Sequence, residues 1–458
     1  MKKLYNIIMV LAMVMTACLW QSCSDSYPDM SYVSDNRNSE EYETDILVPS
    51  LNVNSLLYAT SKVANKGSVG SDSEGPLDPE NDYENFIKRY ARARFYILAY
   101  RKTVMADGSG TLSTLPDFTR LMGDDDNRLN CLLSTERPSI SGSDQHVGKL
   151  AVPQGAKKDG NISEVKTNGS LDLLENADWE DNQNYKLQRY FWNTKKYEKV
   201  GYNFFAYYIG NADIYGFERY SDCVKIDLNL DGKNDIMVGS APEVTEDLLK
   251  KEYAKSVTED EIRKNIVKYG DGAYSTYGAV HSVQPKIDLK HALAYIKFRV
   301  KKIDEETDVS LIGIRVKDVN SRGKLTVASR DLENIKLGLT DFSEPKDIDV
   351  PAYVPSSEIS TEDYTQAGEG VLVPPSSAYQ IEVGVQQENK KTSETDEEAS
   401  GSSVVWLPPI TCAPENGFEA GKIYVIDISV YGTTAIIITT EVEGWKSDTG
   451  ATVDLYDE

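Results

Sequence analysis

The clearest hydrophobic pattern in the chain lies in Pro285–Lys302, PKIDLKHALAYIKFRVKK. From His291 onward apolar and polar side chains alternate, which is typical of a strand with one buried and one solvated face. Asp304–Thr307 provides a polar turn, and the apolar alternation then resumes, so the pattern predicts a β-hairpin. The expected buried side chains are Ala292, Ala294, Ile296, Phe298, Val300, Ile312, Ile314 and Val316, and the expected solvated ones are Tyr295, Lys297, Arg299 and Lys301.

Similar alternation elsewhere predicts further strands joined by turns. A last hairpin turns near Gly432; its buried side chains are expected to be Tyr424, Ile426, Ile428, Val430, Ile436, Ile438 and Val442. Many short strands separated by turns indicate a mainly β protein built from β-sandwiches. The other predicted strands are Asp45–Asn54, Ala91–Thr103, Tyr202–Ile209, and Val224–Leu230 with Asp235–Gly239 on either side of a turn.

Two short helices are expected as an insertion on this scaffold, at about residues 245–269. Thr245 is placed to cap Glu246–Lys255, and Thr258 with Glu261 forms a capping box for a helix that ends near Tyr269. Gly278 and Pro285 then mark a boundary, which predicts an N-terminal β-sandwich over residues 45–280 and a C-terminal one over residues 285–458.

The N-terminus has the form of an export signal. A basic Met1–Lys3 precedes the apolar segment Leu4–Met15, which is too short to span a membrane stably. A small residue before a cysteine at the end of such a segment is the mark of a bacterial lipoprotein, and both Cys18 and Cys23 fit. Cys23 is preferred because cleavage there leaves a polar start, with residues 1–22 as signal peptide and 23–44 as tether. The predicted location is therefore the outer membrane, through a lipid anchor.

Composition narrows the class of partner. The chain has 458 residues and a formal charge of −24, which argues against nucleic acid, since a polyphosphate requires Lys and Arg on the binding face. The remaining cysteines, Cys131, Cys223 and Cys412, are far apart and odd in number. They define neither a disulfide framework nor a metal spacing, and whether any two form a disulfide stays open.

The sharpest local motif is an aspartate-rich turn with acidic or amide side chains at alternate positions around Gly232. Such a set can converge on Ca²⁺, and Asp227, Asn229, Asp231 and Asp235 are its candidate ligands. It is not an EF-hand loop, because the twelfth position is Val238. The alternative is a plain Asx-rich β-turn, since these residues favour turns without any metal.

Nothing in the sequence indicates an enzyme. The three histidines, His146, His281 and His291, form no recognisable catalytic or metal motif, and no nucleophile elbow, phosphate loop or dinucleotide fingerprint is present. We therefore predict no catalytic residues and no cofactor other than the candidate calcium ion.

Three stretches together resemble the fimbrillin family of Bacteroidales lipoproteins, which are pilus subunits: Asp231–Pro242 (DGKNDIMVGSAP), Ile287–Val300 and Gly421–Trp445. The resemblance implies two tandem transthyretin-like β-sandwich domains in a structural or adhesive subunit of a cell-surface fimbria. It also favours the turn interpretation of the aspartate-rich segment. Its implied partners are other fimbrial subunits or copies of the same chain, together with a host or bacterial surface ligand.

In such pili an Arg- or Lys-specific protease removes an early strand, and a strand of the next subunit fills the groove. Arg37, Lys62 and Lys66 are the basic residues near the candidate first strands, and the sequence does not choose among them. A donor strand is predicted near the C-terminus, where Ala451, Val453 and Leu455 alternate with polar residues. The alternative is that this segment is the last edge strand of its own sandwich.

Two other functions remain open. A lipid-anchored glycan-binding protein of an outer-membrane uptake system would suit the tyrosine-rich strands and predicts a concave, exposed cluster of Trp and Tyr. A secreted hydrolase with an unrecognised site is the third possibility. A fimbrial subunit predicts instead an open or self-filled strand groove.

Overall fold

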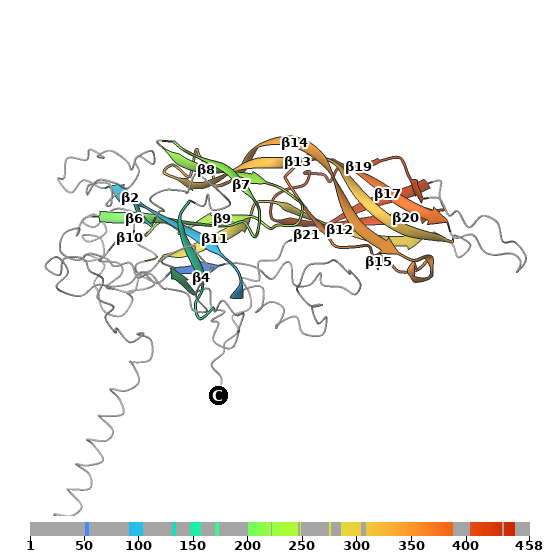
Figure 1. Ribbon diagram of the computed structural model, residues 1–458, viewed down its shortest axis with the longest axis horizontal. Coiled ribbons are helices and arrows are strands. Elements are labelled where there is room, and N and C mark those ends of the chain that lie inside the picture. The colour runs from blue at the N-terminus through green and yellow to red at the C-terminus, as the bar shows by residue number, and fades with distance from the viewer. Residues whose placement is uncertain are drawn as a thin grey trace, which may run out of the picture. The chain divides into compact units, whose positions relative to one another are not determined.

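The computed structural model describes residues 51–54, 91–103, 131–133, 147–156, 170–173, 200–220, 222–245, 248, 274–275, 285–303, 308–387, 404–432 and 435–444. All of them lie in the second of two units of the chain, Leu47–Glu458. Strands dominate this part of the chain, and the one named helix in it is the 3₁₀ helix η1, Ser356–Glu358. The predicted mainly β fold is confirmed (Figure 1).

The first sheet is built mostly from the N-terminal half. Its strands run in the order β10-β6-β9-β11-β1-β5-β4-β2-β3, and β6 also pairs with β2. Seven of the described strands therefore form a closed ring, which leaves no free edge among them. The bounds are β1 Leu51–Asn54, β2 Phe95–Thr103, β3 Cys131–Leu133, β4 Lys149–Pro153, β5 Ser170–Leu173, β6 Val200–Tyr208, β9 Met237–Ser240, β10 Tyr274–Ser275 and β11 Lys286–His291.

A second sheet contains the longest strand described. β13 runs over Val309–Ser329 and pairs with β8, β14 and β17. The order is β18-β17-β13-β8-β7, with β14 on β13 and β19 on β17. The bounds are β7 Ile214–Arg219, β8 Cys223–Asn229, β14 Gly338–Val354, β17 Tyr379–Gln387, β18 Val404–Trp406 and β19 Ile410–Cys412.

The third sheet has five strands in the order β15-β12-β20-β21, with β16 also on β12. β12 and β20 are parallel, whereas β20 and β21 form an antiparallel hairpin. The bounds are β12 Ala294–Lys302, β15 Thr365–Gln366, β16 Val371–Val373, β20 Lys422–Tyr431 and β21 Ala435–Gly444.

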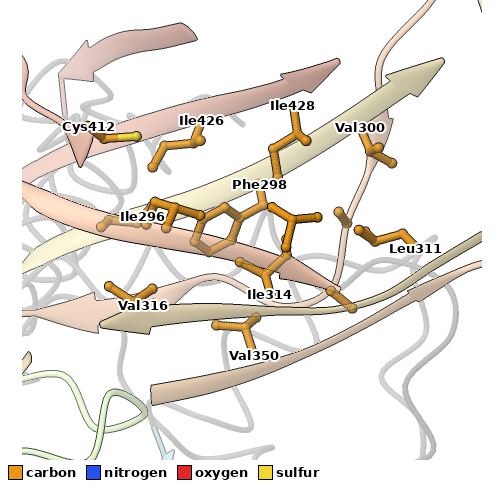
Figure 2. Packing of buried hydrophobic residues seen from close by; sticks show 14 of the residues in the cluster. Ile296, Phe298, Val300, Leu311, Ile314, Val316, Val350, Cys412, Ile426 and Ile428 are labelled. Carbon is orange, nitrogen blue, oxygen red and sulfur yellow. The ribbon is translucent and has the colours of Figure 1, made fainter. Parts of the chain in front are cut away.

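Among the described residues, two hydrophobic cores connect the sheets. One joins one face of β2 and β6 to β8 and the C-terminal part of β13, through side chains such as Tyr207, Ile226 and Val327. The other fills the sandwich between the second and third sheets, where Phe298 and Ile314 are fully buried (Figure 2). β13 contributes to both cores, so it connects the ring to the sandwich.

The hairpin predicted at residues 285–316 is wrong. The stretch Pro285–Lys302 forms two strands, and the second, β12, does not pair with β13 but lies in the facing sheet. β12 and β13 both contribute apolar side chains to the core between the second and third sheets. Alternation along a strand shows that one face is buried, but it does not identify the strand that pairs with it. The change of phase between Leu289 and Ala292 is the sequence signal of the break between β11 and β12.

Three side chains also differ from expectation. Tyr295, expected on the solvated face, is buried in the first core. Leu311 is buried in place of Ile312, because a β-bulge shifts the register between Leu311 and Gly313. Val442 is 54% exposed although it pairs with the buried Tyr424 across the last hairpin.

The last hairpin itself is confirmed, with Tyr431 opposite Ala435 and Gly432 in the turn at φ +62°. The predicted helices lie outside the described residues except for Leu248, which is helical and donates its N–H to Thr245 Oγ1 over 3.2 Å. The division into two sandwich domains stays a prediction. The first strand after the predicted boundary, β11, pairs with β1 and β9 of the ring.

Candidate assembly site

The strand β1 lies between β5 and β11 and closes the ring. It runs parallel to β11, with Val53 opposite Ile287, and antiparallel to β5, with Leu51 opposite Leu171. It has four residues and comes from the beginning of the described chain. A single short strand from far away in sequence therefore joins β5 to β11.

β11 forms one wall of this position, and its side chains alternate. Ile287 and Leu289 are buried, while Lys286, Asp288 and Lys290 are exposed. A strand beside β11 keeps the same pleat, so its alternate side chains face the buried or the solvated side of the sheet. The position thus suits a strand in which apolar and polar residues alternate.

The other side of β11 is held close against β9. Asp288 pairs with Ser240 and Leu289 with Gly239. A Cβ atom on Gly239 would lie 1.9 Å from the carbonyl oxygen of Asp288. Only glycine allows this approach, so the β9–β11 wall is tightly fixed.

Two long strands lie at sheet edges, and they differ in the features that discourage pairing with another chain. Among the strands that the structure describes, β14 pairs only with β13 and β21 only with β20. β14 carries the exposed Pro345 and Pro351 and is interrupted by register shifts against β13, devices that discourage pairing with another chain. β21, AIIITTEVEG, has no proline and no basic residue, and it exposes Ile437 and Val442 by about half.

An ion-pair network lies across the outward face of the sheet that contains β21. Arg299 on β12 donates to both carboxylate oxygens of Asp427 on β20, at 2.6 and 2.7 Å, and to Glu441 on β21 at 3.2 Å. The hydrogen bonds to Asp427 raise the pKa of the Arg299 guanidinium. Tyr364 packs over the same guanidinium, with the ring centroid 5.4 Å from Cζ. The network ties β12, β20 and β21 together.

The aspartate-rich segment forms a turn closed by its own side chains. Asp231 Oδ1 accepts hydrogen bonds from the N–H groups of Lys233 and Asn234, at 2.9 and 3.1 Å, and its Oδ2 accepts one from Asn234 Nδ2 at 2.8 Å. This is the Asx-type geometry of the alternative interpretation. Gly232 adopts φ +79°, in the left-handed region that glycine favours.

The same turn is a junction between distant parts of the fold. Asn234 Oδ1 accepts the N–H of Asn211 over 2.9 Å, and the Gly232 carbonyl accepts the N–H of Leu372, next to β12, over 2.8 Å. Asp235 is buried and contacts His291 Nδ1 at 2.8 to 3.0 Å, at the point where β11 ends.

The four candidate calcium ligands are not brought together around one point by any contact in this arrangement. Asp231 closes the turn and Asp235 contacts His291, whereas Asp227 lies 3.7 Å from Lys324 Nζ and Asn229 ends β8. Within the described ranges no group of three His, Cys, Asp or Glu side chains could hold a metal ion. The calcium site stays a prediction. A melting temperature that is higher in excess calcium than in the presence of a chelator would support it.

Most of the other predicted site residues fall outside the described residues. These are the lipidation candidates Cys23 and Cys18, the basic residues Arg37, Lys62 and Lys66, and the donor-strand residues Ala451, Val453 and Leu455. Cys223 and Cys412 are buried free thiols. Among the described residues, no helix is long and apolar enough to cross a membrane.

Sequence reasoning missed the parallel pairing of β1 with β11. Parallel neighbours far apart in sequence leave no turn signal between them, and the pattern within β1 does not identify its partner. The alternation of Ile287 and Leu289 with polar residues predicts a strand with one buried face, but it does not specify which segments pair with that strand.

No family model matches the chain, and no curated protein does. Solved structures do align with it. A candidate cell adhesion protein from Bacteroides uniformis is 10% identical over 88% of this chain and 99% of that one, with a TM-score of 0.37. The fimbrial anchor protein Mfa2 from Porphyromonas gingivalis is 10% identical over 78% and 90% of the two chains, with a TM-score of 0.31. A fimbrilin from the same organism is 11% identical over 58% and 85%, with a TM-score of 0.28.

Proposed function

We propose that this chain is a structural or adhesive subunit of a cell-surface fimbria, exported as a lipoprotein and assembled by strand exchange at the position of β1. One observation carries the proposal. A four-residue strand from the start of the described chain joins β5 to β11 and closes the ring. Its loss would leave two strands with unpaired backbone groups, and an incoming strand can satisfy both at once.

The position of β1 in the sequence means that cleavage after each of the three basic residues would affect this strand differently. A cut after Lys62 or Lys66 separates Leu51–Asn54 from the rest of the chain, whereas a cut after Arg37 leaves β1 attached. Only the first kind of cut frees the position between β5 and β11. We therefore propose Lys62 or Lys66 as the processing site.

The proposed donor is the segment Ala451–Tyr456 of a neighbouring copy. Ala451, Val453 and Leu455 would follow the same alternation as Ile287 and Leu289 on β11. In this proposal Cys23 carries the lipid that holds the unprocessed subunit at the outer membrane.

Material sheared from cells tests the assembly. The intact chain should give SDS-resistant ladders, because strand exchange buries a whole strand in the partner. Ladders should disappear in Lys62→Ala/Lys66→Ala and in a chain that lacks residues 451–458, and should persist in Arg37→Ala. Loss of ladders in Arg37→Ala alone would contradict the proposed cut.

A cross-link tests the place of exchange. Cysteines introduced at Asp454 of one copy, on the polar face of the proposed donor strand, and at Asp288 of another should form an intermolecular disulfide in assembled material. Asp288 is exposed on β11 opposite Asn54 of β1. The matched control pairs Asp454→Cys with Tyr353→Cys, since Tyr353 is 66% exposed on β14, far from the ring position in sequence and in another sheet. Equal cross-linking to both positions would place the donor elsewhere.

A further inference from the structure

A cavity of about 610 Å³ lies where the ring meets the second sheet. Tyr100 of β2 and Phe205 of β6 form its floor. The turn between β7 and β8, at Asp222, and the connection from β13 to β14, at Arg330–Ile335, form its rim. The cavity belongs to neither the proposed exchange position nor the aspartate-rich turn.

A backbone hydrogen bond between the two rim segments and side-chain hydrogen bonds within the loop hold this rim in place. Arg330 N donates to the carbonyl oxygen of Asp222 over 2.9 Å, which ties the two rim segments together. Asp331 Oδ1 and Oδ2 accept from Asn334 N and Nδ2 at 3.1 and 2.7 Å, so the loop keeps its form. The cavity is therefore preformed, which lowers the entropy cost of filling it.

The lining has an apolar base and an acidic rim. Ala241 and, from the rim, Leu332 and Ile335 add apolar surface to the cavity, and Leu332 is 41% exposed at the opening. Four carboxylates line the cavity against one guanidinium, that of Arg330. Among them, Asp222 and Glu333 come from the two rim segments, one on each side.

This combination selects the chemistry of a ligand. The excess of carboxylates disfavours anions, because like charges repel in a partly desolvated site. The floor aromatics Tyr100 and Phe205 are only 3% and 1% exposed, so they offer no open ring face for a sugar to stack on. A lysine or arginine side chain fits both parts, since its aliphatic stem packs on apolar surface and its charged end pairs with carboxylates.

We propose that this cavity is a binding site for a lysine or arginine side chain of a partner protein. The accessible apolar side chains of Leu332 and Ile335 take the stem, and Asp222 and Glu333 receive the cationic end. The inference does not depend on the fimbrial proposal, because the exchange position lies elsewhere in the fold.

Titration of the full chain with small amides tests this inference. The probes are N-acetyl-arginine amide and N-acetyl-lysine amide, with N-acetyl-norleucine amide, N-acetyl-glutamate amide and lactose as comparisons, followed by NMR line-broadening of the ligand. The two basic amides should bind saturably at millimolar concentrations, as expected for small ligands with few atoms. The uncharged, acidic and sugar probes should bind at least about fivefold more weakly.

Variants locate the binding. Asp222→Asn and Glu333→Gln keep the shape of each side chain and should each weaken the basic amides by about fivefold, the effect of losing one partly exposed charge pair of about 1 kcal/mol. The control is Glu362→Gln, an exposed carboxylate outside the cavity. Equal binding of all probes, tighter binding of lactose, or affinities unchanged in both cavity variants would overturn the inference.

Discussion

At the scale of single residues, Gly239 sets the distance between β9 and β11. A Cβ atom there would lie 1.9 Å from the Asp288 carbonyl oxygen, which belongs to the backbone and cannot turn aside. Gly239→Ala should therefore lower the free energy of unfolding by about 3 kcal/mol, at the upper end of the usual cost of overpacking. Urea unfolding followed by tryptophan fluorescence measures it.

Gly313→Ala is the matched control, because a Cβ atom at this strand glycine would meet nothing closer than 3.5 Å. Its effect should stay within about 0.5 kcal/mol, as for substitutions without a specific clash. Equal losses in the two variants would mean that strand glycines matter here through the unfolded chain and not through the close approach of β9 to β11.

The pair Asp235–His291 should also contribute measurably to stability. Both side chains are at most 9% exposed and their contact is 2.8 Å, so removing the carboxylate leaves a buried imidazole nitrogen without that partner. Asp235→Ala should lower the free energy of unfolding by about 1.5 to 3 kcal/mol, the range for hydrogen bonds to charged groups. Asp213→Ala, which removes an exposed carboxylate, should change stability by less than about 0.5 kcal/mol. Similar losses of unfolding free energy in the two variants would show that the contact between Asp235 and His291 does not stabilise the fold.

Cys412 should make stability depend on alkaline pH. Burial raises the pKa of its thiol from 9.0 to about 11. Because the folded-state pKa lies above the unfolded one, the stabilising effect is complete below pH 9 and is lost as the pH rises toward 11. Wild type should thus lose stability between pH 9 and 11 relative to Cys412→Ala, as measured by urea unfolding. Parallel curves for the two proteins would contradict this.

At the scale of elements, β21 should be the edge through which folded copies associate at high concentration. It has ten residues, exposes Ile437 and Val442, and lacks the prolines and bulges of β14. Ile437→Lys/Val442→Lys should keep the monomer folded and reduce association in light scattering, because a charged edge resists pairing. Tyr353→Lys on β14 is the control and should change association little.

The strands differ in how far the sequence predicts them. The hairpin β20–β21 follows from its alternation and from Gly432, because both strands and their turn are local. The pairing of β12 with β20 does not follow, since the two strands are parallel and more than a hundred residues apart. The turn around Asp231 was recognisable from residue type, but its contacts with Asn211, Leu372 and His291 depend on the tertiary fold.

At the scale of the whole molecule, the ring and the sandwich should respond differently to the loss of β1. Cleavage after Lys62 or Lys66 removes the strand that joins β5 to β11. The β20–β21 hairpin packs instead in the core between the second and third sheets. Hydrogen exchange should therefore accelerate in residues 170–173 and 286–291 and stay slow in residues 422–431. Equal acceleration in both regions would show that the two cores unfold as one cooperative unit.

The pairing of β1 with β11 has a consequence for folding kinetics. The two strands come from opposite halves of the chain, so a long loop must close before they meet, and parallel pairing over such a separation is slow. During that interval β5 and β11 are available to whichever strand arrives first. The competition between β1 and a foreign strand is then decided by relative rates, and a subunit that emerges beside a growing polymer has a different outcome from one that folds alone.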